Sequence, residues 1–359
     1  MKIDEIYPAT INEKEKPPFF HNILPEVIQA LSEKKTEQAP LYLFTLNNAY
    51  VSPYGAVFKN GKVISQSVYK SSGLKNWRNF LSFCNKIIRN KVKKIEGNCI
   101  VINHSWYQNY YHWMIEIVPR LFLIKDNLSD KKLVIHKSIS KFHIDVLSKF
   151  NFKEIIFIED NEVLKCETIC FTSFPNYYTN KYLTLASQKN KIIELNINAS
   201  LMKEMKQWFQ INNPLIKQSI ITSNKLYISR KKAGHRKILN ELELEKILSV
   251  NGFQKCFLED FSFDDQVQLL NNCGIVVSIH GAGLTNLLFM QPKTHVINLI
   301  SERHHEFCYL TIAGIADVNY THVNCISTNM KNPAYNDITV NINLLQQVIS
   351  NITTLSQVT

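Results

Sequence analysis

The feature of this chain that most constrains its fold is the regular alternation of short apolar runs and helical patterns across residues 225–300. Apolar runs of strand length occupy Leu226–Ser229, Phe253–Leu258, Ile275–Ile279 and His295–Ile300. Between them, apolar residues recur at helical spacing in Ile238–Val250, after a Ser262/Asp265 capping box, and in Leu284–Met290. This alternation predicts a doubly wound parallel sheet, which binds its ligands at the carboxyl ends of the strands.

The first half of the chain also predicts strands and covering helices, with less regular spacing. Trp77–Ile95 carries basic side chains around an apolar stripe, so it predicts an amphipathic helix whose basic face is either a solvated surface or a membrane contact. Asn60-Gly61 is a hairpin signal. The other expected strands lie within Leu41–Val68 and at Lys132–Ile135, Glu154–Ile158 and Thr168–Phe174, and the other expected helices lie at Lys141–Phe150 and Leu201–Ile211.

The polar break at Asn212-Asn213-Pro214 divides the chain into two predicted domains. We expect an N-terminal domain over residues 1–212 and a C-terminal domain over residues 213–335. An apolar helix within residues 336–359 is expected to pack back across both domains. A chain of 359 residues is long enough for two cores of ordinary domain size.

The charge and cysteine content of the chain limit the kinds of ligand and metal site that we expect. The formal net charge of +11 favours an anionic partner, but no zinc-finger or RNP-like motif supports binding to nucleic acid. The eight cysteines are scattered and complete no zinc site, so we expect reduced core residues. The start of the chain lacks a secretory pattern, and no apolar run reaches the ~18–20 residues of a membrane span. We therefore expect a cytoplasmic protein.

The turn after Ile275–Ile279 is the first candidate for ligand binding. An apolar strand ends at His280, and the small residues Gly281, Ala282 and Gly283 lead into a helical segment that begins with Leu284 and Thr285. The amino end of such a helix presents unpaired N–H groups and a partial positive charge. This pattern predicts a phosphate-binding site.

A basic loop after Leu226–Ser229 predicts a second part of that site. Arg230, Lys231, Lys232 and Arg236 place four cations within seven residues at a strand's carboxyl end. Arginine forks match phosphate oxygens two at a time, whereas a solvated basic loop is the alternative. No Asp-x-Asp metal-binding motif, Walker loop or dinucleotide fingerprint is present, so we expect a nucleotide ligand bound without a metal.

The segment from Tyr110 to Leu121 predicts an acid–base site. On a helix, His112, Glu116 and Arg120 share one face, and Pro119 is expected to kink or end that helix. A histidine four residues before a glutamate can hydrogen-bond to it, and either group can then take a proton from a hydroxyl. A Glu116–Arg120 surface salt bridge beside a packed His112 is the alternative.

At these residues the chain resembles glycosyltransferase family 61. The likeness runs over roughly residues 100–325. It is carried by Asn109-Tyr110-Tyr111-His112-Trp113 with Glu116 and Pro119-Arg120-Leu121, by Tyr227-Ile228-Ser229-Arg230 with Arg236 and Asn240-Glu241, and by His280-Gly281-Ala282-Gly283-Leu284-Thr285-Asn286. Two positions depart from the family pattern: Glu116 stands where many members have Asp, and Asn298 stands where many carry an acidic residue.

The resemblance implies a GT-B-like α/β fold, in which two Rossmann-like domains face each other across a cleft. It implies an inverting, metal-independent transfer of a sugar from a nucleotide sugar, expected to be UDP-linked, to a hydroxyl of a glycan. Glu116 and His112 then fall at the acid–base positions, and Arg230, Arg236 and residues 280–285 at the donor-binding positions.

The expected acceptor is a glycan or a lipid-linked glycan at the inner membrane surface, in the synthesis of capsular polysaccharide or lipopolysaccharide. A noncatalytic nucleotide- or glycan-binding subunit with the same fold is the alternative.

Overall fold

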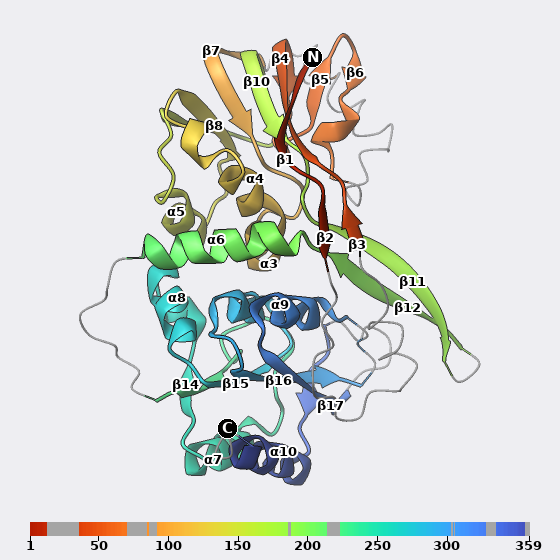
Figure 1. Ribbon diagram of the computed structural model, residues 1–359, viewed down its shortest axis with the longest axis vertical. Coiled ribbons are helices and arrows are strands. Elements are labelled where there is room, and N and C mark those ends of the chain that lie inside the picture. The colour runs from red at the N-terminus through yellow and green to blue at the C-terminus, as the bar shows by residue number, and fades with distance from the viewer. Residues whose placement is uncertain are drawn as a thin grey trace. The chain divides into compact units, whose positions relative to one another are not determined.

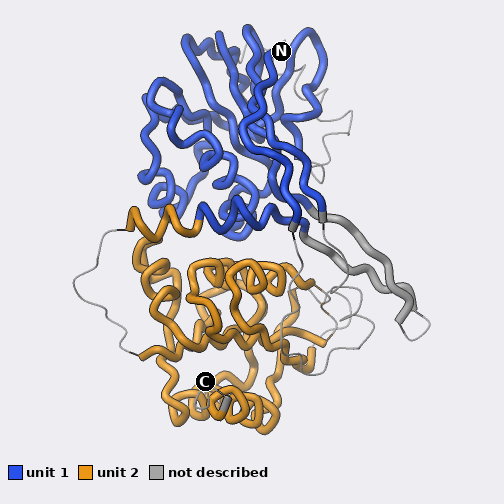
Figure 2. Tube along the Cα trace, in the orientation of Figure 1, with its two compact units in different colours: residues 1–12, 36–178, 196–205 blue, residues 13–35, 179–195, 206–359 orange. Residues whose placement is uncertain are grey.

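The computed structural model describes residues 1–12, 36–69, 85, 92–185, 188–213, 223–302, 304, 306–327 and 335–355. The chain forms two units, shown in blue and orange in Figure 2. Unit 1 comprises residues 1–12, 36–178 and 196–205, and unit 2 includes the described residues of 206–359. The protein is therefore a mixed α/β chain with one parallel-rich sheet in each unit. A cleft between two facing domains stays a prediction.

The sheet of unit 1 has the strand order β6-β5-β4-β10-β7-β8-β9, with β1 paired to β4. Strands β10, β7, β8 and β9 are parallel, whereas β1, β4, β5 and β6 pair antiparallel. The strands are β1 Lys2–Tyr7, β4 Leu41–Val51, β5 Val57–Lys59, β6 Lys62–Val63, β7 Val92–Val101, β8 Lys131–His136, β9 Glu154–Ile158 and β10 Val163–Thr172. The β5–β6 hairpin turns at Asn60 and Gly61, which both adopt positive φ, as the sequence predicts.

Helices and short antiparallel pairs complete the first part of the chain (Figure 1). The helical elements are η1 Ser65–Ser67, α3 Tyr110–His112, η2 Trp113–Ile117, α4 Val118–Phe122, η3 Lys125–Asn127, α5 Lys141–Leu147 and α6 Ala199–Ile211. The pairs are β2 Thr10–Asn12 with β3 Thr36–Gln38, and β11 Tyr177–Leu185 with β12 Gln188–Asn196.

The sheet of unit 2 has the strand order β14-β13-β15-β16-β17-β18. Its first five strands are parallel, so numbered from the first strand in sequence their order is 2-1-3-4-5. In such a sheet the order in which strands are added reverses between the first and third strands, and ligands bind at the carboxyl ends of the strands there. The strands are β13 Lys225–Ile228, β14 Gln254–Cys256, β15 Ile275–Ile279, β16 His295–Ser301, β17 Asn319–Ser327 and β18 Ile338–Thr339.

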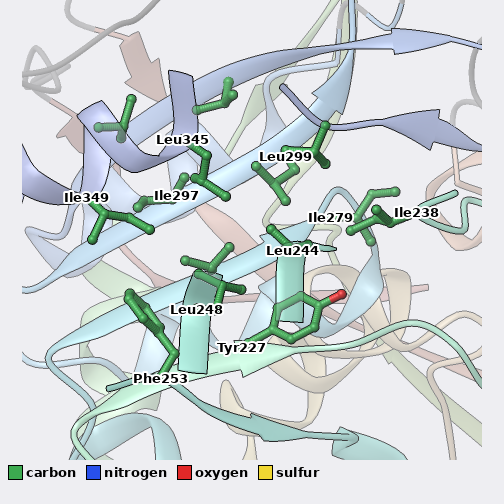
Figure 3. Packing of buried hydrophobic residues seen from close by; sticks show 14 of the residues in the cluster. Tyr227, Ile238, Leu244, Leu248, Phe253, Ile279, Ile297, Leu299, Leu345 and Ile349 are labelled. Atoms are coloured by element: carbon green, nitrogen blue, oxygen red, sulfur yellow. The ribbon is translucent and has the colours of Figure 1, made fainter. Parts of the chain in front are cut away.

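Helices cover both faces of this sheet (Figure 1). The helical elements are α7 Glu241–Val250, η4 Leu258–Asp260, α8 Phe263–Asn271, η5 Ala282–Phe289, α9 Cys308–Ala316 and α10 Ile342–Leu355. Leu244 and Leu248 of α7 and Leu345 and Ile349 of α10 pack into one buried cluster with the sheet (Figure 3). All five residues of β15 are buried, as expected for a strand covered on both sides.

Most predicted elements are present, and two expectations need correction. The predicted helix Trp77–Ile95 lies largely outside the described residues, but its last four residues open strand β7, where Val92 pairs with Val163. The helix after the glycine turn is a 3-10 helix that starts at Ala282. The helix does not end at Pro119 but continues to Phe122, so the kink that was the other expectation stays a prediction.

Two further expectations concern cysteines and helix length. The seven described cysteines are buried free thiols, which confirms their expected role as core residues. Within the described ranges, no helix has the length and apolar character needed to cross a membrane.

Candidate functional site

Glu116 is positioned by an irregular helix whose cause is visible in the sequence. Residues 113–117 form a π-helical turn between two α-helical segments, and such turns occur often at functional sites. Pro119 has no N–H to donate to the carbonyl of Ile115, and the amide of the buried Asn176 donates to that carbonyl instead. Asn109 caps the start of the helix by accepting from the N–H of Tyr111.

The Glu116 carboxylate is fully buried and contacts three polar side chains, which together we call the carboxylate site. Tyr69 Oη donates to Glu116 Oε1 at 2.9 Å. On the other oxygen, His112 Nδ1 lies 3.0 Å from Oε2, and His104 Nε2 lies 2.9 Å from it. Tyr69 and His104 are themselves buried, whereas the His112 side chain is 18% exposed.

The hydrogen bonds of the two histidines indicate where their protons lie. The backbone N–H of Trp106 donates to His104 Nδ1, so the proton of neutral His104 is on Nε2, which faces the carboxylate. His112 Nδ1 faces the carboxylate, so a proton on Nδ1 leaves the lone pair of neutral His112 on Nε2. A buried carboxylate that orients an imidazole in this way is the arrangement of a general base.

The pKa values in this site favour an ionised Glu116 carboxylate beside a neutral His104. Burial opposes ionisation of Glu116, but hydrogen bonds from His104 and His112 outweigh it and hold the pKa of the carboxyl below its usual value. Burial also lowers the pKa of His104, in spite of its contact with Glu116. The site therefore holds its negative charge through hydrogen-bond donors.

Arg120 does not form the expected alternative salt bridge with Glu116. Its guanidinium is fully buried and donates to the carbonyls of Ile102 at 2.5 Å and Thr172 at 3.1 Å. It also lies 4.1 Å from the centre of the Phe174 ring. Arg120 thus ties the carboxyl ends of β7 and β10 together, and burial lowers its pKa to about 9.

A cavity of about 970 Å³ borders the carboxylate site within unit 1. Tyr69 and Phe174 line it, and the Tyr69 ring stacks on His104 with 4.9 Å between ring centroids. Gln38, which is 4% exposed, also lines it, and its Nε2 has no hydrogen-bond partner among the described residues. The cavity thus combines aromatic walls with a buried amide group, as small-molecule sites do.

Unit 2 contains a second site, the arginine site, at the carboxyl ends of β13 and β15. Arg230 follows β13, and its guanidinium packs on the bare Cα of Gly281, where an added Cβ would lie 2.1 Å from Nη1. Gly281 follows β15, the strand beside β13 in the sheet. The contact therefore lies at the switch point of the sheet, where doubly wound proteins bind ligands.

Arg236 completes this site from the same loop. Its Nη1 donates to the carbonyl of His280 at 2.9 Å, and its backbone adopts φ of 59°, which is unusual outside glycine. The Nε atoms of Arg230 and Arg236 are buried without a partner, and neither guanidinium is paired with a carboxylate of the described residues. Burial and the charge of Arg236 lower the pKa of Arg230. The site thus holds two neighbouring cations whose Nε atoms lack a partner among the described residues.

His280 lies among polar side chains beside the arginines. Asn298 Nδ2 lies 3.1 Å from His280 Nδ1, and Glu306 Oε2 lies 3.7 Å from His280 Nε2 and 2.9 Å from His304 Nε2. Burial lowers the pKa of His280 to about 3, so this imidazole is neutral. Burial opposes ionisation of Glu306, but hydrogen bonds from His280 and His304 hold its pKa well below the usual value.

Three of these side chains form a candidate metal site. Ligand atoms of His280, His304 and Glu306 lie within 4.8 Å of one another, a set that can hold a metal ion. In the structure, the N–H of Asn298 faces His280 Nδ1, so the His280 proton lies on Nε2 toward Glu306. Both ring nitrogens of His280 thus face polar atoms of the protein, and the expectation of a metal-independent site stays a prediction.

The remaining residues of the predicted turn have different surroundings. Ala282 and Gly283 are half-buried at the start of η5, and Leu284 is buried in the core of unit 2. Thr285 is buried, and its Oγ1 has no partner among the described residues.

Sequence reasoning missed Tyr69, His104, His304 and Glu306. His104 follows the carboxyl end of β7, and residues 304 and 306 follow that of β16. A polar cluster directly after an apolar run was the available signal for these three. Nothing in the sequence around Tyr69 indicated its contact with Glu116.

Unpaired arginines at the switch point of a doubly wound sheet are a feature of many α/β proteins that bind phosphorylated ligands. The family model for glycosyltransferase 61 matches residues 110–297, from the start of α3 into β16. The chain belongs to glycosyltransferase family 61.

Similar curated proteins are named EGF domain-specific O-linked N-acetylglucosamine transferase. That of Pan troglodytes is 36% identical over 91 residues, which is 24% of this chain and 17% of the relative. That of Gallus gallus is 32% identical over 98 residues, 26% and 18% of the two chains. That of Drosophila melanogaster is 34% identical over 97 residues, again 26% and 18%. The aligned stretch thus spans less than a fifth of these relatives.

Proposed function

We propose that the protein is an inverting glycosyltransferase that moves a sugar from a UDP-linked donor to a hydroxyl of a glycan. The observation that carries the proposal is the pair of His112 and Glu116, because a buried carboxylate that orients an imidazole suits removal of a hydroxyl proton. The family membership supports a sugar transfer, and the relatives' names make N-acetylglucosamine the first sugar to test.

The arginine site supports binding of the donor diphosphate. A diphosphate offers oxygens to the guanidinium forks of Arg230 and Arg236, which have no carboxylate partner among the described residues. Charge that develops on the leaving diphosphate is then stabilised by cations already in place. The hydrogen bonds around His280 support a reaction that needs no metal.

Between the two members of the pair, the contacts favour His112 as the base. Both oxygens of Glu116 already face donors, and the carboxylate is buried, whereas His112 is partly exposed. The acceptor oxygen attacks the anomeric carbon as the bond from that carbon to the diphosphate oxygen breaks, which inverts the configuration. The hydroxyl proton goes to His112 Nε2, the resulting imidazolium is stabilised by Glu116, and the diphosphate leaves with the bonding electrons.

We place this activity in the synthesis of a surface polysaccharide, on the cytoplasmic side of the inner membrane. The net charge of +11 supports an anionic glycan or lipid-linked acceptor. The alternative is a noncatalytic subunit that binds nucleotide without turnover. The Glu116 contacts favour an enzyme, because a binding subunit has no need of a base.

The proposal is tested by thermal melting with a panel of nucleotide sugars, led by UDP-N-acetylglucosamine, followed by assays of nucleotide release. A ligand that binds only the folded protein raises its melting temperature. We expect Glu116→Gln to keep this shift but lose about 10²–10⁴-fold in kcat, and Glu116→Asp, which keeps the charge, to lose less. A protein that binds no nucleotide sugar would contradict the donor site, and full turnover by Glu116→Gln would contradict the pair.

A further inference from the structure

Trp106 is an exposed tryptophan beside the carboxylate site. It is 51% exposed, and it lies in the turn that follows β7. Its indole stacks on the His112 ring, with 5.6 Å between centroids and 29° between planes. A tryptophan held half in water leaves apolar surface uncovered, and tryptophan is a residue type enriched at interfaces.

The exposure of Trp106 does not come from a loose loop. Its backbone N–H donates to His104 Nδ1 at 3.2 Å, and its carbonyl accepts from the N–H of Asn109 at 3.0 Å. The residue that follows, Tyr107, is 2% exposed, and its hydroxyl lies 2.7 Å from His136 Nδ1. The turn is therefore fixed on both sides of an indole that it holds at the surface.

We infer that Trp106 is the platform on which a pyranose ring of the acceptor stacks, so that one of its hydroxyls reaches His112. This inference rests on the proposed function. A pyranose presents a face of C–H groups with partial positive charge, and an indole presents a large face with partial negative charge. The hydroxyls point outward from the edge of the sugar ring, and with 5.6 Å between ring centroids the imidazole stacks offset on the indole.

This geometry favours a sugar over a peptide as the acceptor. A serine or threonine side chain offers one or two carbon atoms, which cover little of an indole, whereas a pyranose ring covers most of it. The area buried on the indole decides the gain in binding, because apolar contact stabilises in proportion to the area removed from water. The acceptor class is therefore a glycan with one unhindered ring face.

The test measures binding of simple pyranosides to the whole protein. The probes are the methyl glycosides of glucose, galactose, mannose and N-acetylglucosamine, observed by saturation-transfer NMR, with UDP-induced melting shifts measured in parallel. The variants are Trp106→Ala and Trp106→Phe, and the control is Phe157→Ala, which removes another aromatic side chain of unit 1 that is 46% exposed.

We expect at least one glycoside to bind the native protein, Trp106→Ala to weaken it tenfold or more, and Trp106→Phe to weaken it less than threefold. Phe157→Ala should bind the glycoside as well as the native protein does, and the UDP-induced melting shifts should be the same in all variants. The inference is overturned if no glycoside binds, if Trp106→Ala binds as well as the native protein, or if a serine-containing peptide binds through Trp106 instead. A loss of the UDP shift in Trp106→Ala would assign the indole to the donor and also overturn it.

The two proposals fail separately in this experiment. If UDP and nucleotide sugars leave the melting temperature of the native protein unchanged, the proposed donor site is wrong, while loss of glycoside binding in Trp106→Ala still supports the platform. If UDP binds but Trp106 has no effect on glycosides, only the platform is wrong.

Discussion

The carboxylate site of unit 1 and the arginine site of unit 2 treat buried charge in opposite ways. Glu116 is an anion that faces three donors of its own unit. Arg230 and Arg236 are cations whose Nε atoms have no partner in the described chain. A charge with partners in the protein is ready for proton transfer, whereas a charge without them is ready for a ligand of opposite sign.

This difference supports the proposed division of the transfer reaction, with proton transfer in unit 1 and donor binding in unit 2. Desolvated cations beside each other repel, and a diphosphate removes that repulsion on binding. The carboxylate site gains nothing from an added anion. We therefore expect changes in unit 1 to affect the chemical step and changes in unit 2 to affect donor affinity, and the predictions below test this division.

The largest effect is expected from His112→Asn. Without an imidazole beside Glu116 the acceptor hydroxyl has no base, so kcat should fall by about 10²–10⁴-fold while the UDP-induced melting shift stays the same. Steady-state nucleotide release measures this. His295→Asn is the control, because His295 is a buried histidine that opens strand β16 in unit 2. Equal losses in kcat for both variants would contradict the assignment.

The second largest effect is expected from Arg230→Ala, on the affinity for UDP. Loss of a charged hydrogen-bond partner for phosphate should weaken UDP binding by roughly 30- to 100-fold. Calorimetric titration with UDP measures it, and Lys231→Ala, which removes an exposed cation from the same loop, should cost less than threefold. Similar losses in both variants would indicate a diffuse basic surface in place of a built site.

Acidification should destabilise the protein through its buried histidines. Burial lowers the pKa of His280 to about 3, below the ~6.5 of the unfolded chain, so between these values only the unfolded state takes the proton. Stability is therefore kept above pH 6.5 and lost as the pH falls, by roughly 2 kcal/mol between pH 7 and pH 5 for this one group.

Burial lowers the pKa values of His104 and His143 as well, which adds to the loss in the same direction. Urea unfolding at pH 7 and pH 5 measures the loss in the free energy of unfolding, and this loss should be smaller in His280→Asn. An unchanged difference in this variant would show that His280 does not contribute.

The smallest effect is expected from Gly281→Ala. The backbone of Gly281 is extended and accepts any residue, but the added Cβ would lie 2.1 Å from Arg230 Nη1. Displacing the guanidinium should weaken UDP binding roughly tenfold. Gly234→Ala is the matched control, since its Cβ would meet no atom within 4 Å. Native affinity in Gly281→Ala would show that this contact does not set the position of Arg230.

Local sequence patterns predicted much of this fold. They succeeded for elements whose own residues contain the full pattern of a strand or of a helix start. The strands at Glu154–Ile158 and Ile275–Ile279 and the capping box of Ser262 and Asp265 are present as predicted. Strand β7 was missed in part because its basic start, Val92–Ile95, continues the charge pattern of the predicted helix before it. Sequence spacing could not mark the point where pairing with β10 replaces helical periodicity.

By itself the sequence predicted the contact of His112 with Glu116 as one of two arrangements, because residues four apart on a helical segment lie on one face. It also determined that Arg230 and Gly281 follow apolar strands. Only the tertiary structure decided that His104 and Tyr69 reach the same carboxylate, and that β13 and β15 lie side by side with Arg230 on Gly281. The physical reason is that strand order and contacts across 51 residues depend on packing of the whole sheet, which no local period encodes.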